Sequence, residues 1–196
     1  MKIQPPMFTL SLAAAVVLAT ATAQAQIYTA NLSGPAESPP NASPGTGFAQ
    51  VTLSLATHQL TVHVDFTGLS STTTASHIHA PTAVPGAGTA GVATQTPTFS
   101  GFPLGVTSGT YDHVFDTLDA ATWNSAYVTA NGGTPAGAEA AFAQALAEGR
   151  AYWNIHTNLF PGGEIRGFLV PEPGTFVLVA VGGIALLFAK RRIGRS

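Results

Sequence analysis

The chain has 196 residues, of which 45% are hydrophobic and only 8% are charged, and its formal net charge is −2. It contains no cysteine, which excludes disulfide bridges and thiolate metal sites. Between Gln26 and Leu169 only two basic residues stand against eight acidic ones. This part of the chain cannot neutralise a phosphate backbone, so nucleic acid is excluded as a partner.

The N-terminal segment has the pattern of a secretory signal peptide. Lys2 precedes an apolar run over residues 7–19, and Ala23 and Ala25 form a small-x-small cleavage site. We therefore expect signal peptidase to remove residues 1–25 by cutting after Ala25. An uncleaved N-terminal membrane anchor is the alternative.

The C-terminal segment has three parts in a fixed order. They are a motif at 170–174 that contains Pro171, Glu172 and Pro173, an apolar run at 175–189, and a basic tail at 190–196. As a transmembrane helix the apolar run would span roughly 22 Å, near the lower limit for crossing a membrane, with the basic tail on the cytoplasmic side. This order resembles the PEP-CTERM sorting signal. The resemblance implies cleavage by an exosortase-like membrane protease in a Gram-negative bacterium; a plain single-span tail anchor is the alternative.

Residues 26–169 are predicted to form one β-rich domain. Apolar and polar residues alternate with period two, as in half-buried strands, at 28–32, 49–55, 60–66, 75–79, 111–118, 151–157 and 164–170. One helix is predicted at 135–148, because Thr134 suits the N-cap and Gly149 follows its end. Residues 80–109 show little periodicity and are expected to form surface loops. The elements indicate an antiparallel β-sandwich, Greek-key-like, with one docked helix.

Three sequence blocks carry most of the distinctive residues of this domain. They read LSGPAESPP at 32–40, SHIHAP at 76–81, and YWNIHT at 152–157 followed by PGGEIRG at 161–167. In this order they resemble the CHRD domain, which is named from chordin and occurs in many bacterial exported proteins. Ala80 and Phe168 depart from the usual Gly and Gln without removing a titratable residue. The resemblance implies a β-sandwich and no established reaction.

A pair of histidines gives the sharpest chemical hypothesis. His77 and His79 lie two apart on a predicted strand, so both imidazoles would project from one face while Ile78 enters the core. Two adjacent imidazoles are half of a Zn or Cu site, and His156 on another predicted strand could complete it. The candidate metal ligands are His77, His79, His156 and Glu37.

A purely structural role explains the same residues. The histidines could hydrogen-bond loop backbone, and Asn154, Glu164 and Arg166 could form a buried polar network beside them. Glu164 and Arg166 share a predicted strand face and could pair, although Glu164 is also a second candidate for an oxygen ligand. The chain lacks the larger set of histidines that a two-metal superoxide dismutase requires.

No catalytic motif is recognised, so no catalytic residue is predicted. We expect an exported, non-enzymatic domain of the cell envelope or extracellular matrix, anchored in the membrane at least transiently through its C-terminal helix. Its candidate partners are an extracellular polysaccharide or a surface protein, contacted through residues 80–109. The alternative is a metal-binding module with Cu or Zn as its only cofactor. A glycoside hydrolase that uses Asp112 and Asp116 is a third hypothesis.

Overall fold

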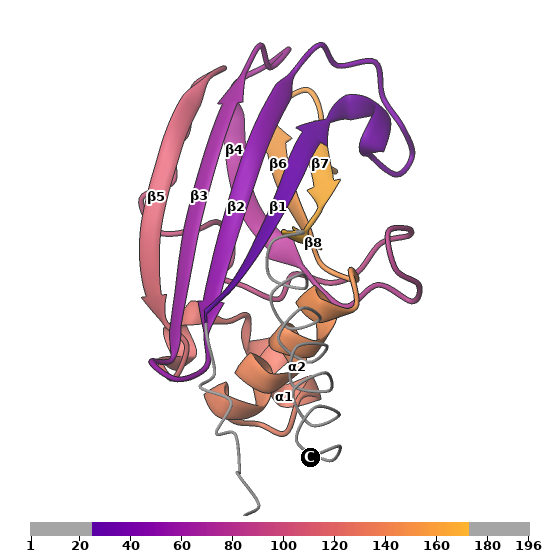
Figure 1. The fold of residues 1–196 in the computed structure, drawn as a ribbon. Coiled ribbons are helices and arrows are strands. Elements are labelled where there is room, and N and C mark those ends of the chain that lie inside the picture. Colours follow the sequence, from indigo (N-terminus) through magenta and orange to yellow (C-terminus); the bar gives the residue numbers. More distant parts are fainter. Residues whose placement is uncertain (1–24, 173–196) are drawn as a thin grey trace, which may run out of the picture.

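The computed structural model describes residues 25–172 and consists mainly of one antiparallel β-sheet (Figure 1). The strands are β1 (Gln26–Ser33), β2 (Thr46–Ser54), β3 (Gln59–Thr67), β4 (Thr73–His79), β5 (Gly109–Asp116), β6 (Tyr152–Thr157), β7 (Ile165–Phe168) and β8 (Val170–Pro171). Their order across the sheet is β4-β6-β7-β1-β2-β3-β5, with β8 paired to β1. In Figure 1 strands β5, β3, β2 and β1 form the front wall, and β4, β6 and β7 lie behind them, so the sheet curls into a half-barrel.

The predicted sandwich of two stacked sheets is therefore wrong, although the mainly β, antiparallel prediction is confirmed. Strand β1 pairs with β2 along its whole length, from Gln26↔Leu53 to Ser33↔Thr46, and with β7 and β8 on its other side. It thus joins the walls that would otherwise be two separate sheets. The period-two pattern shows only that one face of each strand is buried. It does not show whether the facing wall belongs to a second sheet or to the same sheet after it curls.

Residues 80–109 contribute to the core, which corrects the expectation of surface loops. Backbone hydrogen bonds join this segment to the free edge of β4, for example Phe99 N to Ser76 O at 3.0 Å. Ala93, Phe99 and Phe102 are buried, and the ring of Phe99 lies 5.2 Å from that of Trp153 and 5.4 Å from that of Phe115. Phe99 therefore packs between β6 and β5 across the open side of the half-barrel. Single apolar residues separated by Pro and Gly fill this space without producing a period.

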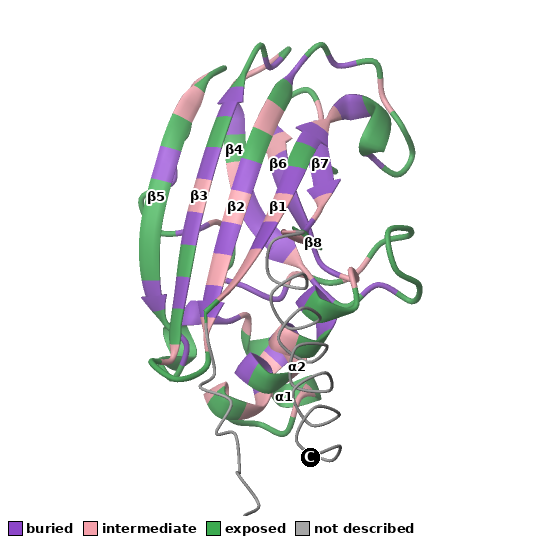
Figure 2. Cartoon of the chain, viewed as in Figure 1, coloured by how far each residue is buried: buried purple, intermediate pink, exposed green. Residues whose placement is uncertain are grey.

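The inward residues of the strands form the hydrophobic core of the half-barrel. Figure 2 shows buried and more exposed residues alternating along β2 and β3. On β2 and β3 buried and more exposed residues alternate, and Val51 of β2 lies opposite Val62 of β3 in the sheet register. This is the alternation predicted for these strands. On β6 and β7 most residues are buried on both faces, because loops cover the outer face there. The candidate site lies on that covered outer face.

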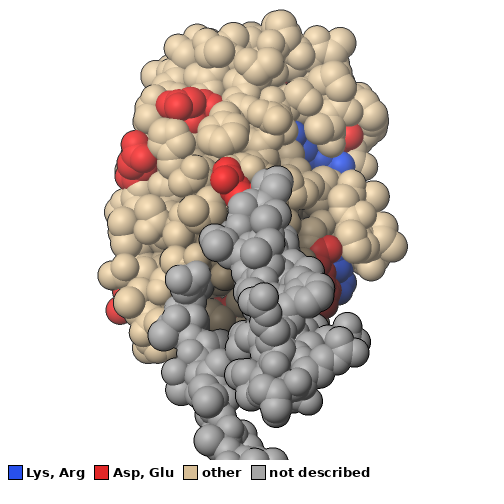
Figure 3. Space-filling view, in the orientation of Figure 1, with Lys and Arg blue, Asp and Glu red and all other residues tan. Residues whose placement is uncertain are grey.

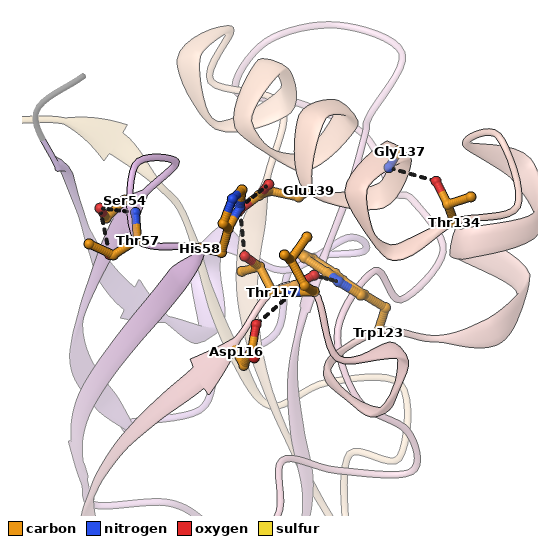
Figure 4. Close-up of polar contacts among 10 residues, drawn as sticks. Ser54, Thr57, His58, Asp116, Thr117, Trp123, Thr134, Gly137 and Glu139 are labelled. Atoms are coloured by element: carbon orange, nitrogen blue, oxygen red, sulfur yellow. Dashed lines mark hydrogen bonds and ion pairs between the residues drawn. The ribbon is translucent and has the colours of Figure 1, made fainter. Parts of the chain in front are cut away.

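Helix α2 (Pro135–Ala147) closes one end of the half-barrel and confirms the helix predicted at 135–148. Its N-cap is Thr134, whose side-chain oxygen accepts a hydrogen bond from Gly137 N at 3.1 Å (Figure 4). After its end, Gly149 adopts a φ of +65°, which suits glycine. Helix α1 (Ser125–Ala130) and two 3-10 turns, Gly34–Ala36 and Ala120–Thr122, were not predicted, because segments this short carry little periodicity.

A buried carboxylate fastens α2 to the sheet. Glu139 accepts a hydrogen bond from the Thr117 hydroxyl, and one of its oxygens lies 3.0 Å from His58 Nδ1 in the β2–β3 turn (Figure 4). The indole of Trp123 donates to the Thr117 carbonyl at 2.9 Å. Glu139 of α2 is thus joined to the turn before β3 through His58 and to the chain after β5 through Thr117. This cluster is fully satisfied within the fold, so we assign it a structural role.

Substitution of Gly167 by alanine is expected to lower the free energy of unfolding by about 1–3 kcal/mol, the usual cost of an overpacked core position. A Cβ at Gly167 would lie 2.9 Å from the Asn31 carbonyl carbon and closer still to its oxygen, so β7 and β1 would have to separate. Gly162 is the matched control, because no heavy atom lies within 4 Å of a Cβ there and its φ is not positive. Urea unfolding of the two alanine variants tests this, and equal stability of both would contradict it.

Candidate metal centre

Strands β4 and β6 bring three histidines to one face of the sheet. Their antiparallel register pairs Ala75 with His156, His77 with Asn154, and His79 with Tyr152. Because side chains alternate along a strand, His77, His79 and His156 project to the same side. The intervening Ile78 and Trp153 point the other way and are fully buried in the core.

The ring nitrogens of the three histidines converge. One candidate ligand atom from each of His77, His79 and His156 lies within 4.8 Å of the others. The Nε2 atoms of His77 and His156 are 2.9 Å apart, and the His77 ring centroid lies 4.7 Å from that of His79. Among residues 25–172 this is the only group of three or more His or acidic side chains gathered so closely.

Backbone carbonyls hold the outer nitrogen of each ring. His77 Nδ1 lies 3.3 Å from Pro97 O, and His79 Nδ1 lies 2.8 Å from Ala90 O. His156 Nδ1 lies 3.0 Å from Pro161 O. A carbonyl oxygen can only accept a hydrogen bond, so each Nδ1 carries the proton and each Nε2 presents a lone pair. The three lone pairs face the centre of the cluster. No sequence pattern could have identified these carbonyl partners, because every residue has a backbone carbonyl.

Burial keeps the three rings uncharged. It lowers the pKa of His77 to about 3, with further lowering by the neighbouring His79 and His156. It lowers the pKa of His79 to about 4, against the raising effect of the hydrogen bond to Ala90, and it also lowers the pKa of His156. At neutral pH the cluster therefore holds three neutral imidazoles, the protonation state that binds metals.

The cluster has an unsatisfied centre. His79 Nε2 is buried and has no hydrogen-bond partner. The lone pairs of His77 and His156 face each other at 2.9 Å, an arrangement that is repulsive unless a proton or cation lies between them. One ring could take the other tautomer, but it would then lose its carbonyl partner. A cation at the centre satisfies all three Nε2 atoms at once.

Arg166 lies beside the cluster. Its guanidinium is 4.8 Å from the centre of the Tyr152 ring, which in turn stacks on His79 at 4.7 Å and 4°. Nε of Arg166 donates to Ala36 O, and Nη1 donates to Gly88 O at 3.0 Å. Arg166 thus links the stacked rings to the loops that cover this face.

Glu37 lies with Arg166 and not with the histidines. Its carboxylate is 3.8 Å from Arg166 Nε and 3.5 Å from Asn154 Nδ2. Burial raises the pKa of Glu37 to about 7, although Arg166 opposes the shift. The four residues proposed as ligands from the sequence therefore divide into a cluster of three histidines and a separate acid.

The predicted network of Asn154, Glu164 and Arg166 also divides. Glu164 is fully buried and accepts hydrogen bonds from the hydroxyls of Ser43 at 2.6 Å and Thr157 at 2.7 Å. Burial alone would raise its pKa, but these bonds and that from Ser70 N outweigh burial and lower it. Glu164 thus stabilises loop connections, whereas Asn154 and Arg166 surround Glu37.

Comparison with protein families decides the identity of the domain. The CHRD domain model matches residues 28–169, well over half of the chain. The chain belongs to the CHRD domain family. Comparisons with curated proteins and with solved structures found no match. In this CHRD domain the three histidines come from two of the sequence blocks that carry the family resemblance, SHIHAP and YWNIHT.

The CHRD domain is followed by a PEP-CTERM protein-sorting motif, matched over residues 169–192. The motif marks the chain as an exported, envelope-associated protein that an exosortase-like system processes. Its first residues form β8, and Glu172 N donates to Ile27 O at 3.0 Å, so the motif begins at the edge of the sheet. Neither CHRD nor PEP-CTERM is an enzyme family.

The predicted signal peptide and the predicted membrane span at 175–189 lie outside the described residues, which begin at Ala25 and end at Glu172. Within residues 25–172 no helix is both long and apolar enough to cross a membrane.

The carboxylates considered for glycoside hydrolysis lie far from the cluster in the sheet order, on strand β5. Asp112 is exposed and its Oδ1 lies 2.8 Å from His63 Nδ1, which belongs to neighbouring β3. Asp116 is also exposed and accepts from Leu118 N at 2.8 Å. Each has a local partner at the surface, which gives no support to a shared catalytic role.

Proposed function

We propose that this exported CHRD domain binds one divalent transition-metal ion, Zn²⁺ or Cu²⁺, through Nε2 of His77, His79 and His156. The observation that carries the proposal is the arrangement of the three rings. Every Nδ1 is held by a carbonyl, the Nε2 atoms of His77 and His156 are 2.9 Å apart, His79 Nε2 is buried without a partner, and one ring nitrogen from each histidine lies within 4.8 Å of the others. In metal sites a ligating histidine regularly donates its other ring N–H in this way, which fixes the tautomer and the ring plane.

The spacing of the nitrogens supports the same ion class. Imidazole nitrogens bind Zn²⁺ at about 2.0–2.1 Å, which places two ligands of a tetrahedral site roughly 3.4 Å apart. The separations between ring nitrogens in the cluster lie around that value: the Nε2 atoms of His77 and His156 are 2.9 Å apart, and no separation exceeds 4.8 Å. Imidazole ligands favour Zn, Cu or Ni over Mg and Ca.

We further propose that the domain serves as a non-enzymatic metal-binding module displayed at the cell envelope. Membership of two families without enzymatic activity and the sorting motif support this role. Contact with a polysaccharide or a surface protein through residues 80–109 remains a separate proposal. Val84 and Leu104 in that segment are 53% and 50% exposed and would be available for it.

The test is metal retention by the full-length chain purified in detergent. After loading with Zn²⁺ or Cu²⁺ and removal of excess metal, elemental analysis is expected to find about one ion per chain. His79→Ala is expected to weaken binding by at least about 100-fold, since loss of even an outer-shell partner costs 10–100-fold.

His113→Ala is the matched control, because His113 is exposed on β5, away from the cluster, and its loss should change nothing. Failure of the unaltered chain to retain Zn²⁺ or Cu²⁺ at near-stoichiometric level would refute the metal proposal. Equal retention by the His79→Ala chain would move the site elsewhere.

A further inference from the structure

The proposed metal centre contains no negatively charged protein ligand. Among residues 25–172 the cluster consists of His77, His79 and His156 alone, and the chain has no cysteine. Neither candidate acid belongs to the cluster: Glu37 contacts Arg166 and Asn154 through Oε2 while its Oε1 is buried without a hydrogen-bond partner, and Glu164 is bound by three hydrogen-bond donors. Zinc sites with four protein ligands are structural, whereas sites with three keep a position for a ligand from outside.

The phenol of Tyr152 does not fill this position. Its hydroxyl lies 3.5 Å from Ala90 O and 3.4 Å from Ala90 N. Ala90 O is also the partner of His79 Nδ1, so the hydroxyl lies on the Nδ1 side of the His79 ring. The carbonyls of Pro97 and Pro161 hold Nδ1 atoms in the same way, at the outer rim of the cluster.

The charge at the centre would be strongly positive. Three neutral imidazoles leave the full charge of +2 on the ion, and Arg166 adds a buried cation two stacked rings away. Glu37 lies next to Arg166 and offsets that charge, not the charge of the ion. Taking an uncompensated ion out of water is costly. The centre therefore favours a negative fourth ligand.

Among residues 25–172 the surface offers no competing basic site for an anion. On the face shown in Figure 3 most of the surface is uncharged, with separated acidic groups over the sheet and basic groups along one side only. Within the described residues the cations other than histidine are Arg150 and Arg166, and Arg150 is engaged by Glu148 at 2.9 Å.

We propose that the metal on the three histidines keeps one coordination position for a small monoanion, of the carboxylate or azide class, supplied from outside the chain. This inference rests on the proposed metal site. The ligand must be compact, because His77 is buried and His79 and His156 are partly buried. The centre thus acts as a receptor for an anionic group and not only as a store for the ion.

The experiment uses full-length chain in detergent, stripped with EDTA and loaded with Co²⁺, whose visible absorption reports its ligands. Addition of sodium azide is expected to shift the absorption bands with a saturable one-site curve, and sodium acetate should compete with azide for the same site. Sodium perchlorate at equal ionic strength is the salt control. The His113→Ala chain should respond as the unaltered chain does, and the His79→Ala chain should lose the Co²⁺ bands.

The possible failures can be told apart. Stoichiometric Co²⁺ with bands that neither azide nor acetate alters would mean that the chain itself fills the fourth position, which overturns this inference and leaves the metal site standing. Absence of bound Co²⁺, Zn²⁺ and Cu²⁺ would overturn both. A shift produced equally by perchlorate would reduce the effect to ionic strength and would also overturn the inference.

Discussion

Replacement of Arg166 by alanine is expected to lower the free energy of unfolding by about 3–5 kcal/mol, the range for a buried ion pair that loses one partner. The Arg166 side chain is almost fully buried and lies 3.8 Å from the carboxylate of Glu37. It also donates to the carbonyls of Ala36 and Gly88. The alanine variant would leave two carbonyls without these donors and a carboxylate without its cation, all in the interior. Urea unfolding of the metal-free chain measures the loss.

Arg150→Ala is the matched control within the described residues. Arg150 pairs with Glu148 at 2.9 Å, with side chains that are 28% and 38% exposed, and it donates one further hydrogen bond to the Thr82 carbonyl. Exposed pairs of this kind contribute about 1 kcal/mol or less. The two variants remove the same side chain, so a difference between them reports the burial of Arg166. An unchanged melting temperature for Arg166→Ala would show that its contacts do not stabilise the fold.

A double-mutant cycle separates charge from packing. Arg166→Met keeps most of the side-chain volume and should destabilise the chain nearly as much as alanine, because Glu37 loses its cation. Adding Glu37→Gln should recover part of that loss, since the remaining amide carries no buried charge. Strict additivity of the two changes would mean that the pair contributes nothing and that the hydrogen bonds to Ala36 and Gly88 carry the effect.

The elements that the sequence predicts well are those with a strong local pattern. Strands β2 and β3 alternate cleanly over nine residues each, and α2 has a capping threonine, an initial proline and a terminal glycine. Local pattern also placed His77 and His79 on one face, because residues two apart in a strand always share a face. None of this required knowledge of the rest of the chain.

The features that the sequence does not predict depend on contacts between distant segments. The curled sheet arises because β1 pairs on both edges, and pairing partners are not encoded in the alternation of one strand. Phe99 is a core residue, but its neighbours Ser100 and Gly101 give no period to reveal it. In a segment of this kind, the hydrophobicity of an isolated aromatic residue is therefore a better indication of burial than periodicity is.

The same limit applies to the candidate site. Three histidines could be grouped from two strand patterns, but the placement of Glu37 beside Arg166 depends on a loop more than a hundred residues away in sequence. From the sequence alone, the Glu37 carboxylate is equally compatible with a metal ligand and with the partner of a cation. Only the fold distinguishes these two roles.

Acidification of the metal-free chain below pH 6.5 is expected to destabilise it steeply. The unfolded chain protonates His77, His79 and His156 near pH 6.5, whereas in the folded chain the pKa of His77 is about 3, that of His79 is about 4, and that of His156 is also lowered. Unfolding therefore takes up protons between these values, and stability falls as pH falls. Each such proton corresponds to about 1.4 kcal/mol per pH unit.

The carboxyl group of Glu37 has the opposite effect on the pH dependence of stability. Because burial raises the pKa of Glu37 to about 7 from 4.5, the folded chain binds a proton there that the unfolded chain binds only below pH 4.5. It therefore cancels one of the three histidine protons between pH 6.5 and about 4.5. The raised pKa of His63 adds nothing in this window, since its contribution is already complete below pH 6.5. His77 and His79 take up about two protons on unfolding and Glu37 cancels one, so the slope is at least about 1.4 kcal/mol per pH unit, and the lowered pKa of His156 adds to it.

Urea unfolding in EDTA at a series of pH values between 7 and 4.5 measures this slope. His77→Gln should reduce the slope by about one proton. Zn²⁺ at the proposed site would compete with protons for the same ring nitrogens, which only the folded chain brings together, so saturation with Zn²⁺ should preserve stability to lower pH. A flat profile between pH 6.5 and 4.5 would mean that the rings are already charged in the folded chain. Three charged rings could not occupy adjacent positions with their nitrogens within 4.8 Å, so the cluster itself would then have to open.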